Sequence, residues 1–361
     1  MSTAPPLRWG ILGTGHIARA FCADLALTDS GSAVAVGSRR QATADAFAAE
    51  LGLARAHGSY GALLEDPDID VIYVATPHPF HRGNAIAALE SGKPVLVEKP
   101  LAMNAAEARD IATLAQARGL FAMEAMWTRF LPHVQRIREW IAAGAIGEIV
   151  AVMADHGQSF TPDPGHRLFA PELGGGALLD LGVYPVSFAS MLLGPPQRVV
   201  ALLDPAFTGV DAQTSMLLGY AGGAQAILTC TLAAQGPTRA VIVGTMGRIE
   251  TGPRFYAPTD VTLIPREGEP VHVPSRHTGS GLRHQADEVA RCLAAGETES
   301  PLMPLEETVS IAATMDTVLA RGVAPAMGPA PGWRRGGPTP GRAGSDQASV
   351  TWRLSKATYP E

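Results

Sequence analysis

Hydrophobic positions in the first third of the chain alternate between short apolar runs and longer segments with helical spacing. The apolar runs cover 7–12, 33–37, 71–75 and 95–97, and the helical segments that follow them cover 17–27, 42–51, 82–89 and 105–117. Strands that are almost continuously apolar are typical of a parallel sheet covered by helices on both faces. We therefore predict an α/β Rossmann domain, a doubly wound parallel sheet, over residues 1–125.

The pattern changes in the second part of the chain. Short segments of strand character, separated by Gly and Pro turns, cover 149–153, 199–203, 214–220, 225–232 and 241–245. Helical spacing returns at 176–193, 283–295 and 305–321. These features predict an α+β domain with a mostly antiparallel, open sheet over residues 126–321. Residues 322–361 are rich in Gly and Pro without hydrophobic periodicity, and we expect a flexible tail.

Composition narrows the function classes. The 361 residues carry a net charge of -6, so no broad positive field is available to attract nucleic acid or an anionic membrane. The three cysteines, Cys22, Cys230 and Cys292, have no C-x-x-C spacing, and no His/Asp/Glu cluster has the spacing of metal ligands. No signal segment and no long charge-free apolar stretch is evident, so we expect a cytoplasmic protein without a metal.

A glycine-rich turn with the pattern Gly-x-Gly-x-x-Ala follows the first predicted strand. Gly13 permits a tight turn, Gly15 lets the backbone approach a pyrophosphate, and Ala18 is small enough for close helix packing. The N–H groups of His16 and Ile17 then face the phosphates at the positive end of a helix. The alternative is a glycine turn without a ligand, but the strand–turn–helix context favours a dinucleotide site.

The end of the second strand indicates which dinucleotide binds. NAD-preferring sites usually carry a carboxylate there for the ribose 2′-hydroxyl. This chain has Ser38, Arg39 and Arg40 instead, and a guanidinium is suited to the 2′-phosphate of NADP. The alternative is that the arginines are solvated surface charges. We predict NADP rather than NAD.

Two further strand ends carry polar residues. Because ligands of open α/β sheets bind at the carboxyl ends of strands, we expect a common nicotinamide-side cluster of Thr76, Pro77, His81, Glu98 and Lys99. For His78, in the same turn, a polar helix cap is the favoured interpretation.

A helix in the second domain begins behind three glycines and carries Asp180 and Tyr184. Their spacing of four places both on one helical face. With Lys99 nearby they would form a proton-transfer set, in which the ammonium lowers the pKa of the phenol. Spacing alone equally permits an interior polar pair that caps the glycine loop.

Four motifs occur together in one order: Gly-x-Gly-x-x-Ala, Ala-Thr-Pro-x-x-x-His, Glu-Lys-Pro and Gly-Gly-x-x-x-Asp-x-Gly-x-Tyr. In this the chain resembles the Gfo/Idh/MocA oxidoreductases over residues 7–321. The resemblance implies a Rossmann domain followed by a sheet domain whose open face often forms a homodimer. It also implies that Lys99 is the lysine of the Glu-Lys-Pro motif.

Within that family, Tyr184 stands where many members carry His. This version is similar to the branch of dimeric dihydrodiol dehydrogenases and NADP-dependent D-xylose dehydrogenases. The similarity implies that Tyr184 is the general acid/base, assisted by Lys99 and Asp180. It further implies that Trp127 and Phe160 bind substrate and that Arg167 approaches the cofactor, although His166 replaces a more usual Trp.

We therefore expect reversible hydride transfer between NADP(H) and a secondary alcohol or hemiacetal carbon of an aldose, polyol or cyclic trans-diol. Two alternatives stay open. One is a sensor or regulatory protein that binds NADP without turnover, which the presence of Lys99 and Tyr184 opposes. The other is a glycoside-cleaving relative that retains NAD for transient oxidation.

Overall fold

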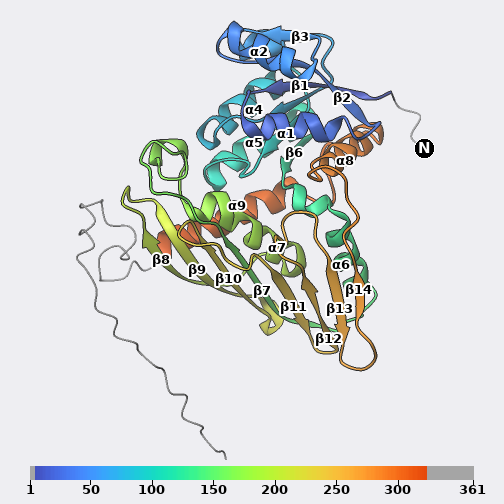
Figure 1. Cartoon of the computed structure of the whole chain (residues 1–361), viewed down its shortest axis with the longest axis vertical. Coiled ribbons are helices and arrows are strands. Elements are labelled where there is room, and N and C mark those ends of the chain that lie inside the picture. Colours follow the sequence, from blue (N-terminus) through green and yellow to red (C-terminus); the bar gives the residue numbers. More distant parts are fainter. Residues whose placement is uncertain (1–4, 323–361) are drawn as a thin grey trace, which may run out of the picture.

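A computed structural model of the chain describes residues 5–322, so the predicted tail lies outside the described residues except for Gly322. The first sheet has the order β3-β2-β1-β4-β5-β6, and all its pairings are parallel. Its strands are β1 (Leu7–Leu12), β2 (Gly31–Gly37), β3 (Arg55–His57), β4 (Val71–Val74), β5 (Val95–Glu98) and β6 (Ala122–Ala125). This is the Rossmann sheet that the apolar runs predict, and Figure 1 shows it above the second sheet.

Helices cover this sheet on both faces, as the alternating pattern requires. They are α1 (His16–Leu25), α2 (Gln41–Leu51), α3 (Tyr60–Leu64), α4 (His81–Glu90) and α5 (Ala105–Arg118). Helix α5 illustrates how local residues set both the start and the end of a helix. The side chain of Asn104 accepts a hydrogen bond from the Glu107 N–H, and Gly119 closes the helix in the left-handed conformation.

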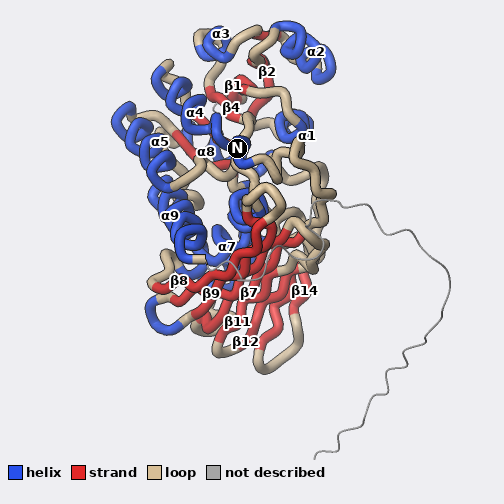
Figure 2. The backbone as a smooth tube through the Cα atoms, turned by 90° about the vertical axis from the view of Figure 1, so that its left-hand side faces the viewer, coloured by secondary structure: helices blue, strands red, loops and turns tan. Residues whose placement is uncertain are grey.

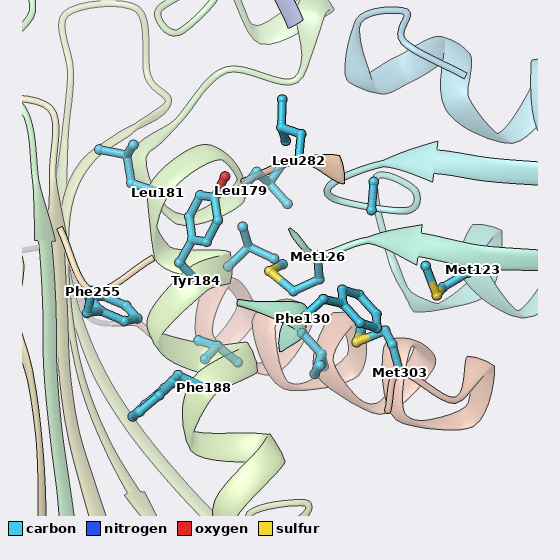
Figure 3. Packing of buried hydrophobic residues seen from close by; sticks show 14 of the residues in the cluster. Met123, Met126, Phe130, Leu179, Leu181, Tyr184, Phe188, Phe255, Leu282 and Met303 are labelled. Carbon is cyan, nitrogen blue, oxygen red and sulfur yellow. The ribbon is translucent and has the colours of Figure 1, made fainter. Parts of the chain in front are cut away.

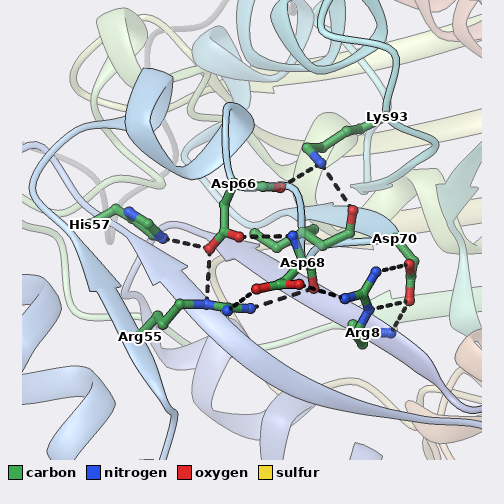
Figure 4. A network of polar contacts seen from close by, with 8 residues as sticks. Arg8, Arg55, His57, Asp66, Asp68, Asp70 and Lys93 are labelled. Atoms are coloured by element: carbon green, nitrogen blue, oxygen red, sulfur yellow. Dashed lines mark hydrogen bonds and ion pairs between the residues drawn. The ribbon is translucent and has the colours of Figure 1, made fainter.

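A polar network holds the first sheet together at the edge where β1 begins (Figure 4). Arg8 at the start of β1 pairs with Asp70 at 2.8 Å, while Arg55 of β3 pairs with Asp66 at 2.9 Å. Asp68 bridges the two guanidiniums. The loop that precedes β4 is therefore tied through charge to β1 and β3, which lie on either side of β2.

The second sheet has eight strands in the order β14-β13-β12-β11-β7-β10-β9-β8, and only β7 and β10 pair in parallel. They are β7 (Ile149–Gly157), β8 (Arg198–Pro205), β9 (Asp211–Gly219), β10 (Gln225–Thr231), β11 (Ala240–Gly244), β12 (Gly247–Thr251), β13 (Val261–Pro265) and β14 (Val271–Val273). The predicted mostly antiparallel sheet is thus confirmed. Strands β12 to β14 were not predicted, because each is only three to five residues long and they lack a long apolar run.

Helices α7 (Val183–Leu193) and α9 (Leu305–Arg321) pack on one face of this sheet (Figure 2). Two more, α6 (Pro132–Ala142) and α8 (Arg283–Ala294), complete the second part of the fold, and α8 packs on α1. Helix α9 joins both hydrophobic cores: Val309 and Ala312 belong to the core beneath the parallel sheet, and Met315 and Val318 to the larger one. The two sheets are therefore fixed to each other by shared apolar packing.

One feature of the second part corrects the expectation about apolar stretches. Within the described residues, Pro171–Leu193 is long and apolar enough to cross a membrane by length and composition, with a mean hydropathy of 1.5. In this fold, however, 83% of its most apolar 18-residue window is buried. The segment is also interrupted, since a short 3-10 turn and the π-helix Leu178–Gly182 precede α7. It forms the central core element of the second part of the molecule.

Candidate active site between the two sheets

A cavity of about 960 Å³ opens between the carboxyl ends of the parallel strands and the second sheet's helices and loops. It is lined from the first side by the glycine turn and the strand ends at Ser38, Thr76 and Lys99. From the second side it is lined by Asp180 and Tyr184, among others. Residues that lie far apart in sequence therefore meet here.

The glycine turn leaves room for a phosphate group. Gly13 has φ +113°, and a Cβ there would lie 2.8 Å from the carbonyl oxygen of Ala75, so only glycine fits. A Cβ on Gly15 would have nothing nearer than 4.0 Å, which leaves the space above it open. Helix α1 begins at His16 with no side chain capping it. Its first N–H groups are available to a pyrophosphate, so the turn fits a dinucleotide.

Basic residues stand beside this turn, at the end of β2. Ser38 is buried, whereas Arg39 and Arg40 are exposed and line the cavity. Neither guanidinium has a hydrogen-bond or ion-pair partner among residues 5–322. Both positive charges are thus free to meet an anionic group of a ligand.

Lys99 and Asp180 form the central ion pair of the cavity. The Lys99 ammonium donates to the backbone carbonyl of Asp180 at 2.9 Å and to its Oδ1 at 3.1 Å. Arg167 contacts both carboxylate oxygens of Asp180, at 3.1 and 3.3 Å. Although burial opposes both charges, their attraction raises the pKa of Lys99 and lowers the pKa of Asp180. Both groups are therefore charged at neutral pH.

The spacing of Asp180 and Tyr184 predicted a regular α-helix. In the structure Asp180 lies instead on the π-helix Leu178–Gly182. The carboxylate of Asp211 on β9 accepts a hydrogen bond from the Leu178 N–H at 2.7 Å and from the Thr214 hydroxyl at 2.9 Å. This hydrogen-bond cap from β9 fixes the start of the π-helix. Single π-turns occur frequently at functional sites because they redirect side chains within a helix.

Tyr184, at the start of α7, lies between Leu181, Leu179 and Met126 in the buried cluster of Figure 3. Its hydroxyl accepts a hydrogen bond from the Trp127 indole at 3.1 Å, and the Lys99 ammonium lies 4.9 Å from the ring centroid. Burial raises the pKa of Tyr184 to about 12, while Lys99 acts in the opposite direction. The expected lowering by the ammonium is thus present but is outweighed by burial. This corrects the expectation of a lowered pKa.

His78 belongs to the cluster, although the sequence favoured a simple helix cap. Its Nε2 lies 3.8 Å from Asp180 Oδ1, and its Nδ1 lies 3.3 Å from the carbonyl oxygen of Gly174. Burial, followed by the nearby Lys99 charge, lowers the pKa of His78 to about 3, so the ring is neutral. The signal that could have placed it was its position in the turn that follows β4.

Two predicted cofactor-binding residues, His81 and Glu98, also make hydrogen bonds within the protein. The ring nitrogens of His81, which is fully buried, lie 2.8 and 2.7 Å from the carbonyl oxygens of Pro100 and Thr76. Glu98 accepts hydrogen bonds from the Tyr73 hydroxyl and from the Lys99 N–H. Both residues line the cavity as predicted, and their hydrogen bonds connect the turn after β4 to the end of β5, so their contact with the dinucleotide stays a prediction.

On the substrate side, the cavity lining lacks one predicted residue and includes one that no motif marked. Phe160 is absent from the lining of the cavity in the described chain, and its ring packs 5.8 Å from that of His166. Tyr256, which no motif marked, lines the cavity with its ring centroid 4.9 Å from that of Tyr184. His156 stacks on Tyr256 at 4.3 Å. Trp127 keeps its predicted place, so an aromatic wall surrounds the Tyr184 hydroxyl.

Comparison with known proteins agrees with this architecture. Residues 7–126 match the profile of the oxidoreductase family with an NAD-binding Rossmann fold, and residues 134–250 match the GFO/IDH/MocA C-terminal domain. The chain is 39% identical over 324 residues to trans-1,2-dihydrobenzene-1,2-diol dehydrogenase of Xenopus laevis, covering 86% of this chain and 97% of that protein.

Solved structures share the fold over most of the chain. KijD10, a 3-ketoreductase from Actinomadura kijaniata in complex with NADP and TDP-benzene, is 28% identical with a TM-score of 0.78, covering 88% of this chain and 98% of that one. Aldose-aldose oxidoreductase from Caulobacter crescentus, complexed with glycerol, has a TM-score of 0.80 at 24% identity, covering 88% and 97%. At that identity the second likeness shows the fold alone.

Proposed function

The chain belongs to the GFO/IDH/MocA oxidoreductase family and is a dehydrogenase that acts on CH–OH donors, and we propose that it is NADP-dependent, with a sugar-like molecule or a cyclic trans-diol as substrate. The reacting carbon would be a secondary alcohol or hemiacetal carbon. Support for this substrate class comes from the name of the Xenopus laevis relative and from the polar cavity beside an aromatic wall.

The observation that carries the proposal is the meeting of Lys99, Asp180 and Tyr184 in a cavity that also contains the glycine turn. When bound, the dinucleotide supplies the acceptor or donor of hydride. The residues of the chain then need to hold the substrate oxygen and move one proton. Lys99 is fixed by Asp180 and offers positive charge to that oxygen.

Tyr184 exchanges the proton in this proposal. With a pKa of about 12 the phenol is protonated at neutral pH, which equips it to protonate an oxyanion in the reducing direction. In the oxidising direction the phenol must first lose that proton. We therefore expect the oxidation rate to rise with pH up to the region of that pKa, while the reduction rate stays high at neutral pH.

The experiment that tests the proposal is substitution of Tyr184 and Lys99, each alone and together. Tyr184→Phe keeps the ring but removes the proton, and kcat should fall about 10²- to 10⁴-fold with dinucleotide affinity preserved. Lys99→Met should cause a comparable loss, and the double variant should be little worse than either. Near-normal turnover by a well-folded Tyr184→Phe enzyme, measured on a panel of aldoses and dihydrodiols, would refute the acid/base role.

The preference for NADP rests on Arg39 and Arg40, whose guanidiniums are free at the mouth of the cavity. Arg39→Ala should weaken NADPH binding by about 1.5 to 3 kcal/mol, because a charge-assisted contact with the 2′-phosphate is lost. NADH, which lacks that phosphate, should bind almost unchanged. Equal losses for both dinucleotides in a fluorescence titration would count against the assignment.

We also propose a homodimer formed by a second copy on the outer face of the eight-stranded sheet. That face exposes large apolar side chains on β7 to β10, among them Val200 (64% exposed), Leu217 (52%) and Ile227 (43%). Light scattering on the purified protein should give twice the chain mass, and Leu217→Arg should shift it toward a monomer. A monomer at micromolar concentration in the unsubstituted protein would exclude this interface.

A further inference from the structure

The loop between β12 and β13 carries an unusual backbone conformation. Among residues 5–322, Thr238 and Arg254 are the only non-glycine residues with positive φ, at 53° and 56°. The two positions are joined, because the Phe255 N–H donates to the Thr238 carbonyl oxygen at 3.0 Å. A left-handed backbone is unfavourable for a residue with a Cβ, and it persists only where the surroundings impose it.

The segment to which this loop is hydrogen-bonded, just before β11, is itself held in place. The carboxylate of Asp155 on β7 accepts hydrogen bonds from the N–H groups of Thr238 and Arg239 at 2.7 and 3.0 Å. Phe255 is fully buried, and Arg254 closes a turn through its carbonyl oxygen to the Ala257 N–H at 2.8 Å. Arg254 is therefore held at a fixed place beside a buried anchor, and its side chain projects from there.

That side chain lines the cavity and has no partner. Lys99 and Arg167 both share the carboxylate of Asp180, whereas the Arg254 guanidinium has no ion pair or hydrogen bond within the described chain. The cation also acts on the aromatic wall: burial raises the pKa of Tyr256, and Arg254 opposes that rise. A solvent-exposed positive charge without a counter-charge from the described residues thus lines the cavity.

We propose that Arg254 is an anion-binding residue of this cavity and takes a phosphate or carboxylate group of the bound ligand. The planar guanidinium matches either group through two parallel hydrogen bonds. Two sources of that group are possible: the pyrophosphate of the dinucleotide, or an acidic group on the substrate. The inference rests on the proposed function only in taking this cavity as the site of dinucleotide and substrate.

The backbone offers an independent argument for a side-chain role. At φ 56° glycine suits the turn better than arginine does, because it has no Cβ. Arginine is thus a less favourable residue here than glycine, and this supports a role for its side chain outside the turn. Replacing Arg254 by Gly should therefore separate fold from function.

The test compares Arg254→Gly and Arg254→Gln with Arg266→Gln, a control at an exposed arginine of the same sheet domain that does not line the cavity. NADPH and NADH affinities are measured by fluorescence titration. Binding of D-glucuronate and of D-glucose is measured by calorimetry on the enzyme–NADPH complex, in which the dinucleotide is already reduced and cannot accept a hydride from the sugar. These are binding measurements without turnover, so they remain informative even if Tyr184→Phe overturns the proposed chemistry.

The expected result is a melting temperature for Arg254→Gly no lower than that of the unsubstituted protein, with anion binding weakened about 10- to 100-fold in both Arg254 variants. If the pyrophosphate is the partner, NADPH and NADH weaken equally. If the substrate is the partner, only glucuronate loses affinity relative to glucose. Unchanged affinities for both dinucleotides, together with no loss of glucuronate relative to glucose, overturn the proposal, as does an equal effect of Arg266→Gln.

Discussion

Replacing Asp180 by Asn tests the charge balance of the cavity, because Asn keeps the shape of Asp but removes the charge. In the unsubstituted protein the carboxylate side chain is 6% exposed and faces Lys99 Nζ at 3.1 Å and Arg167 at 3.1 Å. Lys99 keeps one partner in the variant, the Asp180 carbonyl oxygen at 2.9 Å. The perturbation therefore leaves two cations without their common counter-ion.

The two cations respond differently because their burial differs. The Arg167 side chain is 50% exposed and can return to water, whereas that of Lys99 is 14% exposed and cannot. Removing one partner of a buried pair costs about 3 to 5 kcal/mol, and the lower end applies here because only Lys99 is left buried. We expect the free energy of unfolding at pH 7, from urea denaturation, to fall by about 3 kcal/mol.

The sign of the pH dependence follows from the shifts. The folded-state pKa of Asp180 is depressed, so its contribution to stability is present above the unfolded pKa and is lost as pH falls through the folded one. The difference in free energy of unfolding between the unsubstituted protein and Asp180→Asn should therefore become smaller at acidic pH. Without Asp180, burial lowers the pKa of Lys99, so the basic limb of the kcat/KM profile should move to lower pH. An unchanged profile with normal stability would refute the ion-pair reasoning, and Arg167→Gln serves as the milder control.

Two further outcomes concern carboxylates away from Lys99. Asp24 of α1, which is 2% exposed, accepts a hydrogen bond from the Ser280 N–H at 2.6 Å and so ties a cavity-lining segment to the Rossmann domain. Asp24→Ala should lower the free energy of unfolding by about 1 to 3 kcal/mol and speed NADPH release in stopped-flow fluorescence. An unchanged release rate would contradict this. Burial opposes ionisation of Asp66, but hydrogen bonds and the Arg55 charge lower its pKa. Asp66→Asn should therefore lower the melting temperature at pH 7, and the difference from the unsubstituted protein should shrink as pH falls toward 3. A difference in melting temperature that stays constant with pH would contradict this.

Local backbone chemistry made parts of this protein predictable without any tertiary information. Gly13 and Gly15 are demanded by the turn itself, and the apolar runs specify a sheet whose strand ends converge by topology. The proximity of Thr76 and Lys99 follows from that rule alone. The short strands β12 to β14 were missed because three to five residues carry too little periodicity to register.

The sequence by itself therefore determined the two-sheet architecture, the dinucleotide turn and the candidate trio of Lys99, Asp180 and Tyr184. Only the tertiary structure decided what surrounds them, because those neighbours come from segments that share no local pattern. Burial, which no motif encodes, sets the raised pKa of Tyr184, and packing between loops brings Arg254 to the cavity. The order of strands along the chain specifies where the strand ends lie. The desolvation of Tyr184 and the balance of charge around Lys99 and Asp180 arise only once the interior is assembled.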